Sequence, residues 1–85
     1  MAPVVIYTRA YCSYCTWAKE LLRRKGVAFD EIDVTGHREC RAEMIRRANG
    51  STTTPQIFIG STHVGGCDEL YALERADRLD ALLAA

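Results

Sequence analysis

The sequence predicts one α/β domain, residues 1–85, in which helices flank a small four-stranded mixed sheet in the order βαβαββαα. Three observations support this prediction. A chain of 85 residues has room for a single small domain. Short runs of β-branched and aromatic residues alternate with longer segments of helical periodicity. Hydrophobic residues make up 48% and charged residues 26% of the chain, as in ordinary globular proteins.

The first strand and the first helix are expected near the N-terminus. Residues 4–8 form a largely apolar run of β-branched and aromatic residues, which is typical of a strand buried on both faces. The segment Ser13 to Lys25 is expected to be helical, because Cys15, Ala18 and Leu22 recur on one face at i, i+3 and i+7. A glycine follows its cationic last turn and suits the position just after a helix end.

A second strand and a second helix follow. Val27 to Val34 alternates apolar and polar residues and predicts a strand with a more exposed edge character. His37 to Asn49 predicts a helix, which an Asn-Gly pair ends. The residues expected to face the core from this helix are Ala42, Ile45 and Ala48, with Met44 alongside.

The last third of the chain predicts a hairpin and two helices. Gln56 to Ile59 and Thr62 to Val64 are strands joined tightly by a Gly-Ser pair. Cys67 to Arg75 is a third helix, and Asp77 to Leu83 is a short fourth helix with Asp77 as its N-cap. A helix between the first two strands implies that they are parallel. The closing hairpin adds antiparallel strands to the sheet.

Charge and hydropathy exclude several classes of protein. The 11 basic and 11 acidic residues give a net charge of zero, whereas nucleic-acid binders usually carry a basic excess. No apolar run approaches the roughly 18 residues that a membrane-spanning helix needs. Met1-Ala2-Pro3 leads straight into the first strand, without a basic-then-apolar leader. We therefore expect a cytosolic protein with neither nucleic acid nor membrane as a partner. Its thiols would be kept reduced and would serve redox chemistry or metal binding.

Two cysteines, Cys12 and Cys15, stand where the first strand feeds the first helix. Residues at i and i+3 of a helix lie about 5–6 Å apart, and a disulfide needs a Cα separation of roughly 4.4–6.8 Å. The pair could therefore open and close a bond with little backbone movement. A Cys-x-x-Cys pair at this junction is typical of a redox dithiol.

The two sulfurs are expected to play different roles. Cys12 would lie at the start of the helix, where unpaired N–H groups and the helix dipole stabilise an anion. Arg9 adds a cation nearby, and such surroundings lower the pKa of a thiol. Cys15 lies one turn further on the apolar face, where burial disfavours its thiolate. We therefore expect Cys12 to attack and Cys15 to resolve.

Two further segments contain candidate site residues. Thr53-Thr54-Pro55 precedes the third strand, and proline is tolerated at a strand start. Because only about 5–6% of X-Pro bonds are cis, this bond is expected to be trans on the residues alone. Gly66, Cys67 and Asp68 open the third helix, whose free N–H groups could bind a carboxylate. Asp68 could instead cap that helix.

Three segments in order resemble the glutaredoxin family nearly from end to end. They are Tyr7-Thr8-Arg9 with Cys12-Ser13-Tyr14-Cys15, Thr53-Thr54-Pro55-Gln56-Ile57-Phe58-Ile59-Gly60, and Gly65-Gly66-Cys67-Asp68-Glu69-Leu70. The resemblance implies a thioredoxin-like fold with a cis Thr54-Pro55 bond against the cysteine pair. It also implies reduction of protein–glutathione mixed disulfides and protein disulfides, with electrons from glutathione.

The resemblance implies a glutathione site as well. Glutathione would pair with the main chain of Thr54, and its γ-glutamyl carboxylate would meet Cys67 and Asp68. The residues implied to bind glutathione are Arg9, Cys12, Tyr14, Thr53, Thr54, Pro55, Gly66, Cys67 and Asp68, with Arg38 and Arg41 as additional candidates. The implied partners are disulfide-containing or glutathionylated proteins, ribonucleotide reductase among them, and the implied state is a monomer.

The chain departs from the family pattern at two positions near the site. Ser13 replaces the usual proline, and such variants more readily hold a [2Fe–2S] cluster between two chains through the first cysteine and glutathione. A cluster carrier, bridged as a dimer through Cys12, is therefore an alternative. Thr54 replaces the usual valine and keeps the β-branch. Trp17 lies outside the motif, and either partner contact or half-buried packing would explain it.

Two other interpretations remain open. Cys12, Cys15, His37 and Cys40 could form a Cys₃His zinc site. Against this, a chain with a full set of strands and helices has no need of a structural metal. A short redoxin supplied by thioredoxin reductase would keep the fold and change the electron donor. Tyr14 and the segment Gly65 to Asp68 favour glutathione.

Overall fold

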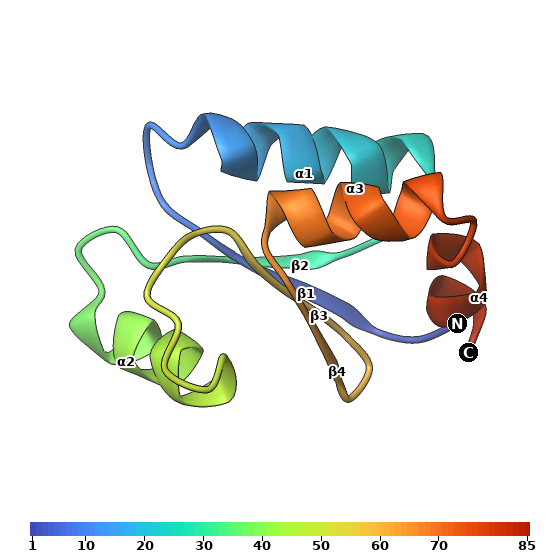
Figure 1. Ribbon diagram of the computed structural model, residues 1–85. Coiled ribbons are helices and arrows are strands. Elements are labelled where there is room, and N and C mark those ends of the chain that lie inside the picture. Colours follow the sequence, from blue (N-terminus) through green and yellow to red (C-terminus); the bar gives the residue numbers. More distant parts are fainter.

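The computed structural model describes all residues, 1–85, and its helices and strands follow the predicted order (Figure 1). In chain order they are β1 (Val4–Thr8), α1 (Ser13–Arg24), β2 (Asp30–Asp33), α2 (Arg38–Arg47), β3 (Gln56–Ile59), β4 (Thr62–Gly65), α3 (Cys67–Arg75) and α4 (Leu79–Ala84). None of these helices is long and apolar enough to cross a membrane.

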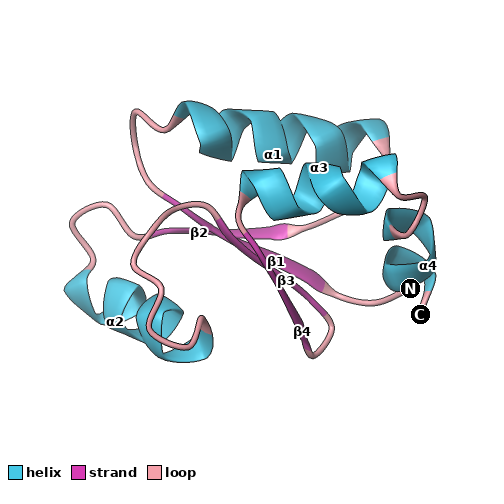
Figure 2. Cartoon of the chain, in the orientation of Figure 1, coloured by secondary structure: helices cyan, strands magenta, loops and turns pink.

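The four strands form one mixed sheet in the order β2-β1-β3-β4. β1 pairs with β2 in parallel, and β3 pairs antiparallel with both β1 and β4, as predicted. Helices α1 and α3 lie together on one face, whereas α2 covers the other (Figures 1 and 2). This is the thioredoxin-like arrangement. It brings the C-terminal end of β1, and so the cysteine pair, to one end of the sheet.

The larger core lies between the sheet and the pair α1 and α3. It joins the apolar faces of β1, α1, β3, α3 and α4. Its buried members are Val4, Ile6, Ala18, Leu21, Leu22, Val27, Ile57, Ile59, Cys67, Leu70, Leu79 and Leu83. Ala18 and Leu22 are fully buried, which confirms the predicted inner face of the first helix.

The smaller core lies under α2 and comprises Tyr7, Val34, Met44, Ala48 and Phe58. Met44 is fully buried, whereas Ala42 is exposed and Ile45 is only half-buried. Ala48 is buried and Ile45 packs against this core, as expected, so the expected inner face of the second helix was wrong only at Ala42. In a helix of ten residues, periodicity alone does not distinguish between neighbouring faces. The packing of Met44 determines which face is buried.

Several boundaries also differ from the sequence-based expectation: α2 runs from Arg38 to Arg47 rather than from His37 to Asn49, and the starts of β2 and α4 have structural causes. Val27 was expected to begin the second strand, but β2 starts at Asp30. The Val27 N–H instead donates to Leu22 O at 3.3 Å, and its buried side chain covers the end of α1. Asp77 was expected to cap the fourth helix, but Arg78 occupies the N-cap position. Asp77 adopts a φ of 56°, so it turns the chain between α3 and α4.

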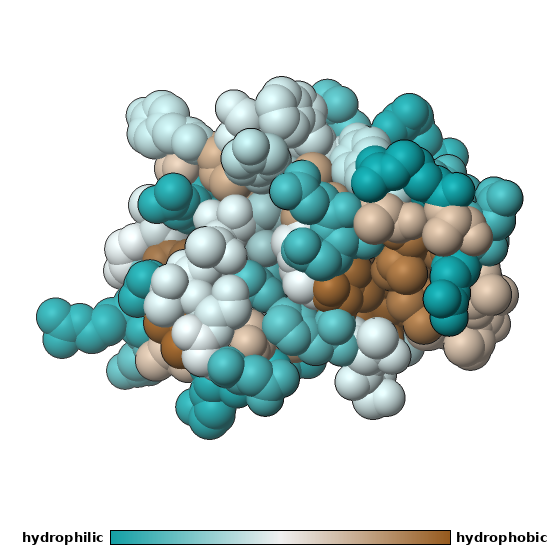
Figure 3. All heavy atoms as spheres, in the orientation of Figure 1, coloured by the Kyte–Doolittle hydropathy of each residue, from teal (hydrophilic) through white to brown (hydrophobic).

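One apolar groove of about 780 Å³ lies between β4, α3 and α4, where Figure 3 shows brown surface on the right. Its apolar walls come from Val64, Leu73 and Leu82 together with alanines of the last two helices. His63 also lines this groove. The cysteine pair lies elsewhere.

Candidate active site

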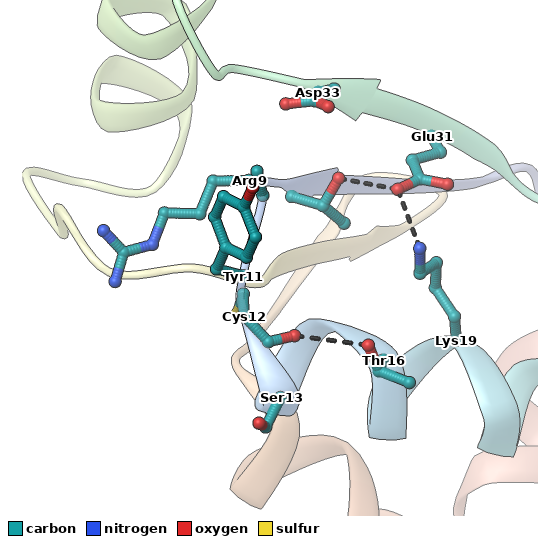
Figure 4. Close-up of a pocket in the computed structure, with 10 residues that line it drawn as sticks. Arg9, Tyr11, Cys12, Ser13, Thr16, Lys19, Glu31 and Asp33 are labelled. Carbon is teal, nitrogen blue, oxygen red and sulfur yellow. Dashed lines mark hydrogen bonds and ion pairs between the residues drawn. The ribbon is translucent and has the colours of Figure 1, made fainter.

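The turn between β1 and α1 places Cys12 at the start of the helix (Figure 4). Ala10 N–H donates to Thr35 Oγ1 at 2.8 Å, which ties this turn to the segment after β2. Tyr11 adopts a left-handed φ of 57° that redirects the chain. Cys12 is then extended, with φ −119° and ψ 103°, and occupies the N-cap position of α1. Its sulfur consequently faces the unpaired N–H groups of the first turn.

Groups from three residues stabilise a negative charge on Cys12. Its Sγ accepts a hydrogen bond from Cys15 N–H at 3.1 Å and one from Thr54 Oγ1 at 3.7 Å. Burial alone would raise the pKa of Cys12. Hydrogen bonds from the side chain and backbone of Cys15, the Thr54 hydroxyl and the charge of Arg9 outweigh that effect, so the pKa lies below the ordinary value of 9.0. Cys12 can therefore supply a thiolate more readily than a free cysteine.

Cys15 has the opposite electrostatics. It lies on the inner face of α1 with 2% of its surface exposed. Burial, and then the hydrogen bond with Cys12, raise its pKa to about 11. The two thiols are neighbours on one helix, yet one favours the thiolate and the other the thiol. The geometry thus has the asymmetry expected for an attacking and a resolving cysteine, although those roles themselves remain predictions.

Pro55 forms the wall opposite the cysteine pair. The Thr54-Pro55 peptide bond is cis, as the family resemblance implied and contrary to the base-rate expectation of a trans bond. Cys12, when protonated, donates to Thr54 O at 3.7 Å, so segments 42 residues apart in sequence meet at the sulfur. Pro55 itself is fully buried, which anchors this wall in the body of the protein.

A groove of about 550 Å³ runs from this wall to the start of α3. It is lined by Arg9, Tyr14, Thr52, Thr53, Thr54, Pro55, Gly66, Cys67, Asp68 and Glu69. Apart from Cys12, which contacts Thr54 at its edge, every main candidate for glutathione binding lines it. Arg38 and Arg41, the additional candidates, are exposed on α2 and are not among its lining residues.

Glu69, not Asp68, caps α3. The Glu69 carboxylate accepts a hydrogen bond from Gly66 N–H at 2.7 Å. Asp68 therefore does not serve as the cap, and its carboxylate is free to line the groove. Gly65 has a φ of 110°, and a Cβ there would lie 3.0 Å from Glu69 Oε1. Sequence reasoning missed Glu69, although an acidic residue three positions after the N-cap is a recognisable capping pattern.

A second hollow, of about 550 Å³, lies behind Cys12 (Figure 4). Thr8 Oγ1 donates to Glu31 Oε2 at 2.7 Å, and Lys19 Nζ donates to the same oxygen at 3.0 Å. Thr16 Oγ1 donates to the Cys12 carbonyl at 3.3 Å. The hydroxyl of Thr8, followed by Lys19, lowers the pKa of Glu31 against its partial burial. These contacts tie β1, β2 and α1 together behind the cysteine pair, and no sequence motif indicated them.

Aromatic side chains surround the opening of the site. Tyr11 is fully exposed, and Tyr14 and Trp17 are about half exposed. The rings of Tyr14 and Trp17 meet edge to face, with centroids 5.4 Å apart. Tyr71 on α3 donates its hydroxyl to Trp17 O at 3.1 Å. Trp17 therefore both packs against Tyr14 and presents apolar surface beside the groove.

The zinc interpretation finds no support in the geometry. No group of three or more His, Cys, Asp or Glu side chains lies close enough together to hold a metal ion. His37 is exposed, and Cys40 packs against the smaller core under α2, away from the N-terminus of α1. The four proposed ligands are therefore not brought together.

A thioredoxin-like fold with an asymmetric dithiol facing a cis-proline defines the class as a thiol–disulfide redox protein. Comparison with known proteins specifies the family. The Glutaredoxin family model matches residues 4–64. The glutaredoxin of Pseudomonas aeruginosa is 67% identical over 85 residues, all of both chains.

Solved structures agree with that assignment. The solution structure of a glutaredoxin from Brucella melitensis is 60% identical with a TM-score of 0.85, covering 98% of this chain and 89% of that one. The crystal structure of a buckwheat glutaredoxin–glutathione complex is 29% identical with a TM-score of 0.85, covering 98% of this chain and 77% of that one. The chain belongs to the glutaredoxin family and has an oxidoreductase role.

Proposed function

We propose that this chain is a glutathione-dependent thiol–disulfide oxidoreductase in which Cys12 is the nucleophile and Cys15 the resolving thiol. One observation carries the proposal. The Cys12 sulfur caps α1 at 3.1 Å from an N–H group and lies at the edge of a groove that ends at the start of a second helix. A stabilised thiolate is thus placed beside a site of suitable size for a small extended peptide.

The proposed reaction with a glutathionylated protein has two displacement steps. The Cys12 thiolate attacks the glutathione sulfur, so a Cys12–glutathione disulfide forms and the protein thiolate leaves and takes up a proton. A second glutathione thiolate then attacks the glutathione sulfur of that disulfide. Oxidised glutathione leaves, and Cys12 returns as a thiolate. The net reaction consumes one free glutathione, and the glutathionyl group of the substrate becomes the other half of the oxidised glutathione.

A protein disulfide takes a different second step. Cys12 attacks one substrate sulfur and forms a mixed disulfide with the protein, releasing the other sulfur as a thiol. Cys15 then loses its proton and attacks the Cys12 sulfur, which frees the reduced substrate and leaves a Cys12–Cys15 disulfide. The high pKa of Cys15, about 11, keeps this thiol protonated and unreactive until the mixed disulfide lies next to it.

The groove supports glutathione as the electron donor. The main chain of Thr54 would pair with the cysteinyl backbone, and the N–H groups at Cys67 and Asp68 would meet the γ-glutamyl carboxylate. Arg9 supplies a cation near the glycyl carboxylate, and Tyr14 borders the sulfur. The likeness to the buckwheat glutaredoxin, which was solved as a glutathione complex, supports this assignment.

The test is a glutathione-coupled reduction assay with a glutathionylated peptide and with a protein disulfide. We expect Cys12→Ser to abolish turnover of both substrates. Cys15→Ser should retain turnover of the mixed disulfide and lose that of the protein disulfide. Cys40→Ser, outside the groove, is the matched control. Turnover with thioredoxin reductase but not with glutathione would refute the choice of electron donor.

A [2Fe–2S] carrier is the second candidate, and Ser13 favours it. With serine in place of proline, position 13 keeps an N–H and a hydroxyl next to Cys12. A single chain has no group of three metal-binding side chains, so a cluster would take Cys12 from each of two chains together with glutathione. Such a cluster would supply electron-transfer or cluster-donation chemistry. Anaerobic reconstitution with glutathione, followed by visible absorption and mass measurement, tests this; a colourless monomer would refute it.

Several features remain predictions. These are the single domain over residues 1–85, the monomeric state, the cytosolic location, and protein substrates such as ribonucleotide reductase. A sedimentation measurement checks the monomer, and trapping with Cys15→Ser, which should hold substrates on Cys12 as mixed disulfides, identifies the substrates.

A further inference from the structure

A buried amide connects β4 to the wall of the groove. Gln56 begins β3, and only 2% of its surface is exposed. Its Nε2 donates to Ser51 Oγ at 3.0 Å and to Thr53 O and Oγ1 at 3.0 and 3.1 Å. Its Oε1 lies 2.7 Å from His63 Nε2. One side chain thus joins a strand at the sheet edge to the segment that precedes Thr54.

The partners determine which atom donates at each contact. One of the three oxygens that the Gln56 nitrogen faces is the Thr53 carbonyl, which can only accept, so the nitrogen must donate there. Its oxygen therefore faces His63, and the His63 Nε2 must carry a proton and donate. The His63 ring also stacks on Phe58, with centroids 4.9 Å apart and planes at 23°. That stacking orients the ring so that its N–H points at the amide.

The amide holds a segment that lacks regular structure of its own. Residues 51–54 connect the end of α2 to β3 without belonging to either. Ser51 N–H donates to Ala48 O at 3.2 Å, which ties only the beginning of the segment. Thr53 is held by Gln56, and the next residue, Thr54, carries both groups that reach the Cys12 sulfur at 3.7 Å.

We propose that His63 is a positioning residue that acts through Gln56 to hold residues 51–54 in place, and so sets how tightly the groove takes glutathione. This inference depends on the proposed function only in taking glutathione as the ligand of the groove. His63 lies on β4 and is not among the residues that line the groove between Pro55 and the start of α3, so its effect on that groove is indirect. Loss of its N–H would leave the buried Gln56 oxygen without a donor. The amide would then be drawn towards other partners and would release Thr53.

Two variants distinguish the effect of the His63 N–H from the effect of its aromatic ring. His63→Phe keeps an aromatic ring to stack on Phe58 and removes the N–H, whereas His63→Gln removes the ring and keeps an N–H of similar reach. We expect His63→Phe to raise KM for glutathione about threefold to tenfold, the effect of one hydrogen bond, with a smaller change in kcat. His63→Gln should restore most of the affinity.

A measurement without glutathione keeps this inference distinct from the proposed function. Ultraviolet titration of the Cys12 thiolate should show a higher pKa in His63→Phe than in wild type, because Thr54 would no longer be held against the sulfur. The pKa in His63→Gln should return towards wild type. If wild type lacks glutathione turnover but this pattern appears, the positioning role stands and the proposed function fails. Unchanged KM and unchanged titration in His63→Phe would overturn the inference.

The wild-type protein provides a check that needs no folded variant. Nuclear magnetic resonance of the neutral His63 ring should show the proton on Nε2, as the contact with Gln56 requires. A neutral ring with its proton on Nδ1 would break the proposed connection and overturn the inference, whatever the variants do.

Discussion

Alkylation of the two active-site thiols at controlled pH tests the asymmetry between them directly. A thiol reacts with iodoacetamide through its thiolate, so its rate follows the fraction of thiolate present. The pKa of Cys12 lies below 9.0, and that of Cys15 is about 11. Below both values each thiolate fraction falls tenfold per pH unit. A gap of more than about two units therefore corresponds to more than about a hundredfold difference in thiolate.

The experiment uses the reduced wild type and two single substitutions. In wild type near neutral pH, mass spectrometry should find the first alkyl group on Cys12 almost exclusively. In Cys15→Ser, the alkylation rate of Cys12 should rise with pH to a midpoint below 9.0, because the serine hydroxyl can donate in place of the Cys15 thiol and the backbone N–H, the Thr54 hydroxyl and the charge of Arg9 remain. In Cys12→Ser, Cys15 should react slowly, because burial, the largest cause of its raised pKa, remains. Its midpoint should nonetheless fall from about 11, since the hydrogen bond and the charge of Cys12 are gone.

Cys40 and Cys67 are followed in the same digests as internal references. Burial, and then the charge of Asp68, raise the pKa of Cys67, so its alkylation should also lag behind that of Cys12. Preferential labelling of Cys15 in wild type, or a common pH midpoint for Cys12 and Cys15, would refute the assignment of attacker and resolver from helix position.

Three further predictions concern stability. Met44→Ala should lower the free energy of unfolding by about 2–4 kcal/mol in denaturant titrations, because the fully buried side chain leaves a cavity under α2. Glu31→Gln should cost about 0.5 kcal/mol at neutral pH. The Thr8 hydroxyl lowers the pKa of Glu31 in the folded protein. The stabilisation that Glu31 provides is therefore fully present above about pH 4.5 and is lost as the pH falls through the lower folded pKa. Urea titrations of the variant should lack this loss of stability in acid. Gly65→Ala should destabilise by about 1–3 kcal/mol in thermal melts, since φ is 110° and Glu69 is close, whereas Gly36→Ala, at φ 68° with open space around it, should cost less.

The order of elements was predictable because the buried strands are short and largely apolar. β1 and β3 are such runs, and both lie at the centre of the sheet. Prediction was weaker where the chain meets solvent on one side. β2 begins at Asp30 rather than Val27, because Val27 is required to cover the end of α1. An alternating pattern indicates which side chains are buried, but it does not specify which layer buries them.

In the site, too, features that depend on local sequence could be predicted, whereas contacts between distant segments could not. The different surroundings of Cys12 and Cys15 could be predicted, since they follow from a cysteine at a helix start and another one turn later. The Thr54 hydroxyl on the Cys12 sulfur and the Gln56 contact with His63 could not. Each joins residues on different elements, and whether two such side chains meet depends on sheet register and on the path of a loop. The residues that line the groove were predicted from the three motifs of the family resemblance, because local sequence patterns do not indicate them.

The difference between the two thiols arises from the backbone at a single turn. Helical spacing alone makes Cys12 and Cys15 neighbours and would treat them alike. β1 ends at Thr8, and the left-handed Tyr11 then redirects the chain and leaves Cys12 outside the helix in an extended conformation, so its sulfur faces the Cys15 N–H. Cys15, inside the helix, has its own N–H occupied by that sulfur, and its side chain points into the protein. That hydrogen bond acts together with those from the Cys15 side chain and the Thr54 hydroxyl and with the charge of Arg9 to lower the pKa of Cys12. The asymmetry between the two thiols therefore depends on the helix cap, which leaves Cys12 facing hydrogen-bond donors, and on the burial of Cys15 inside the helix.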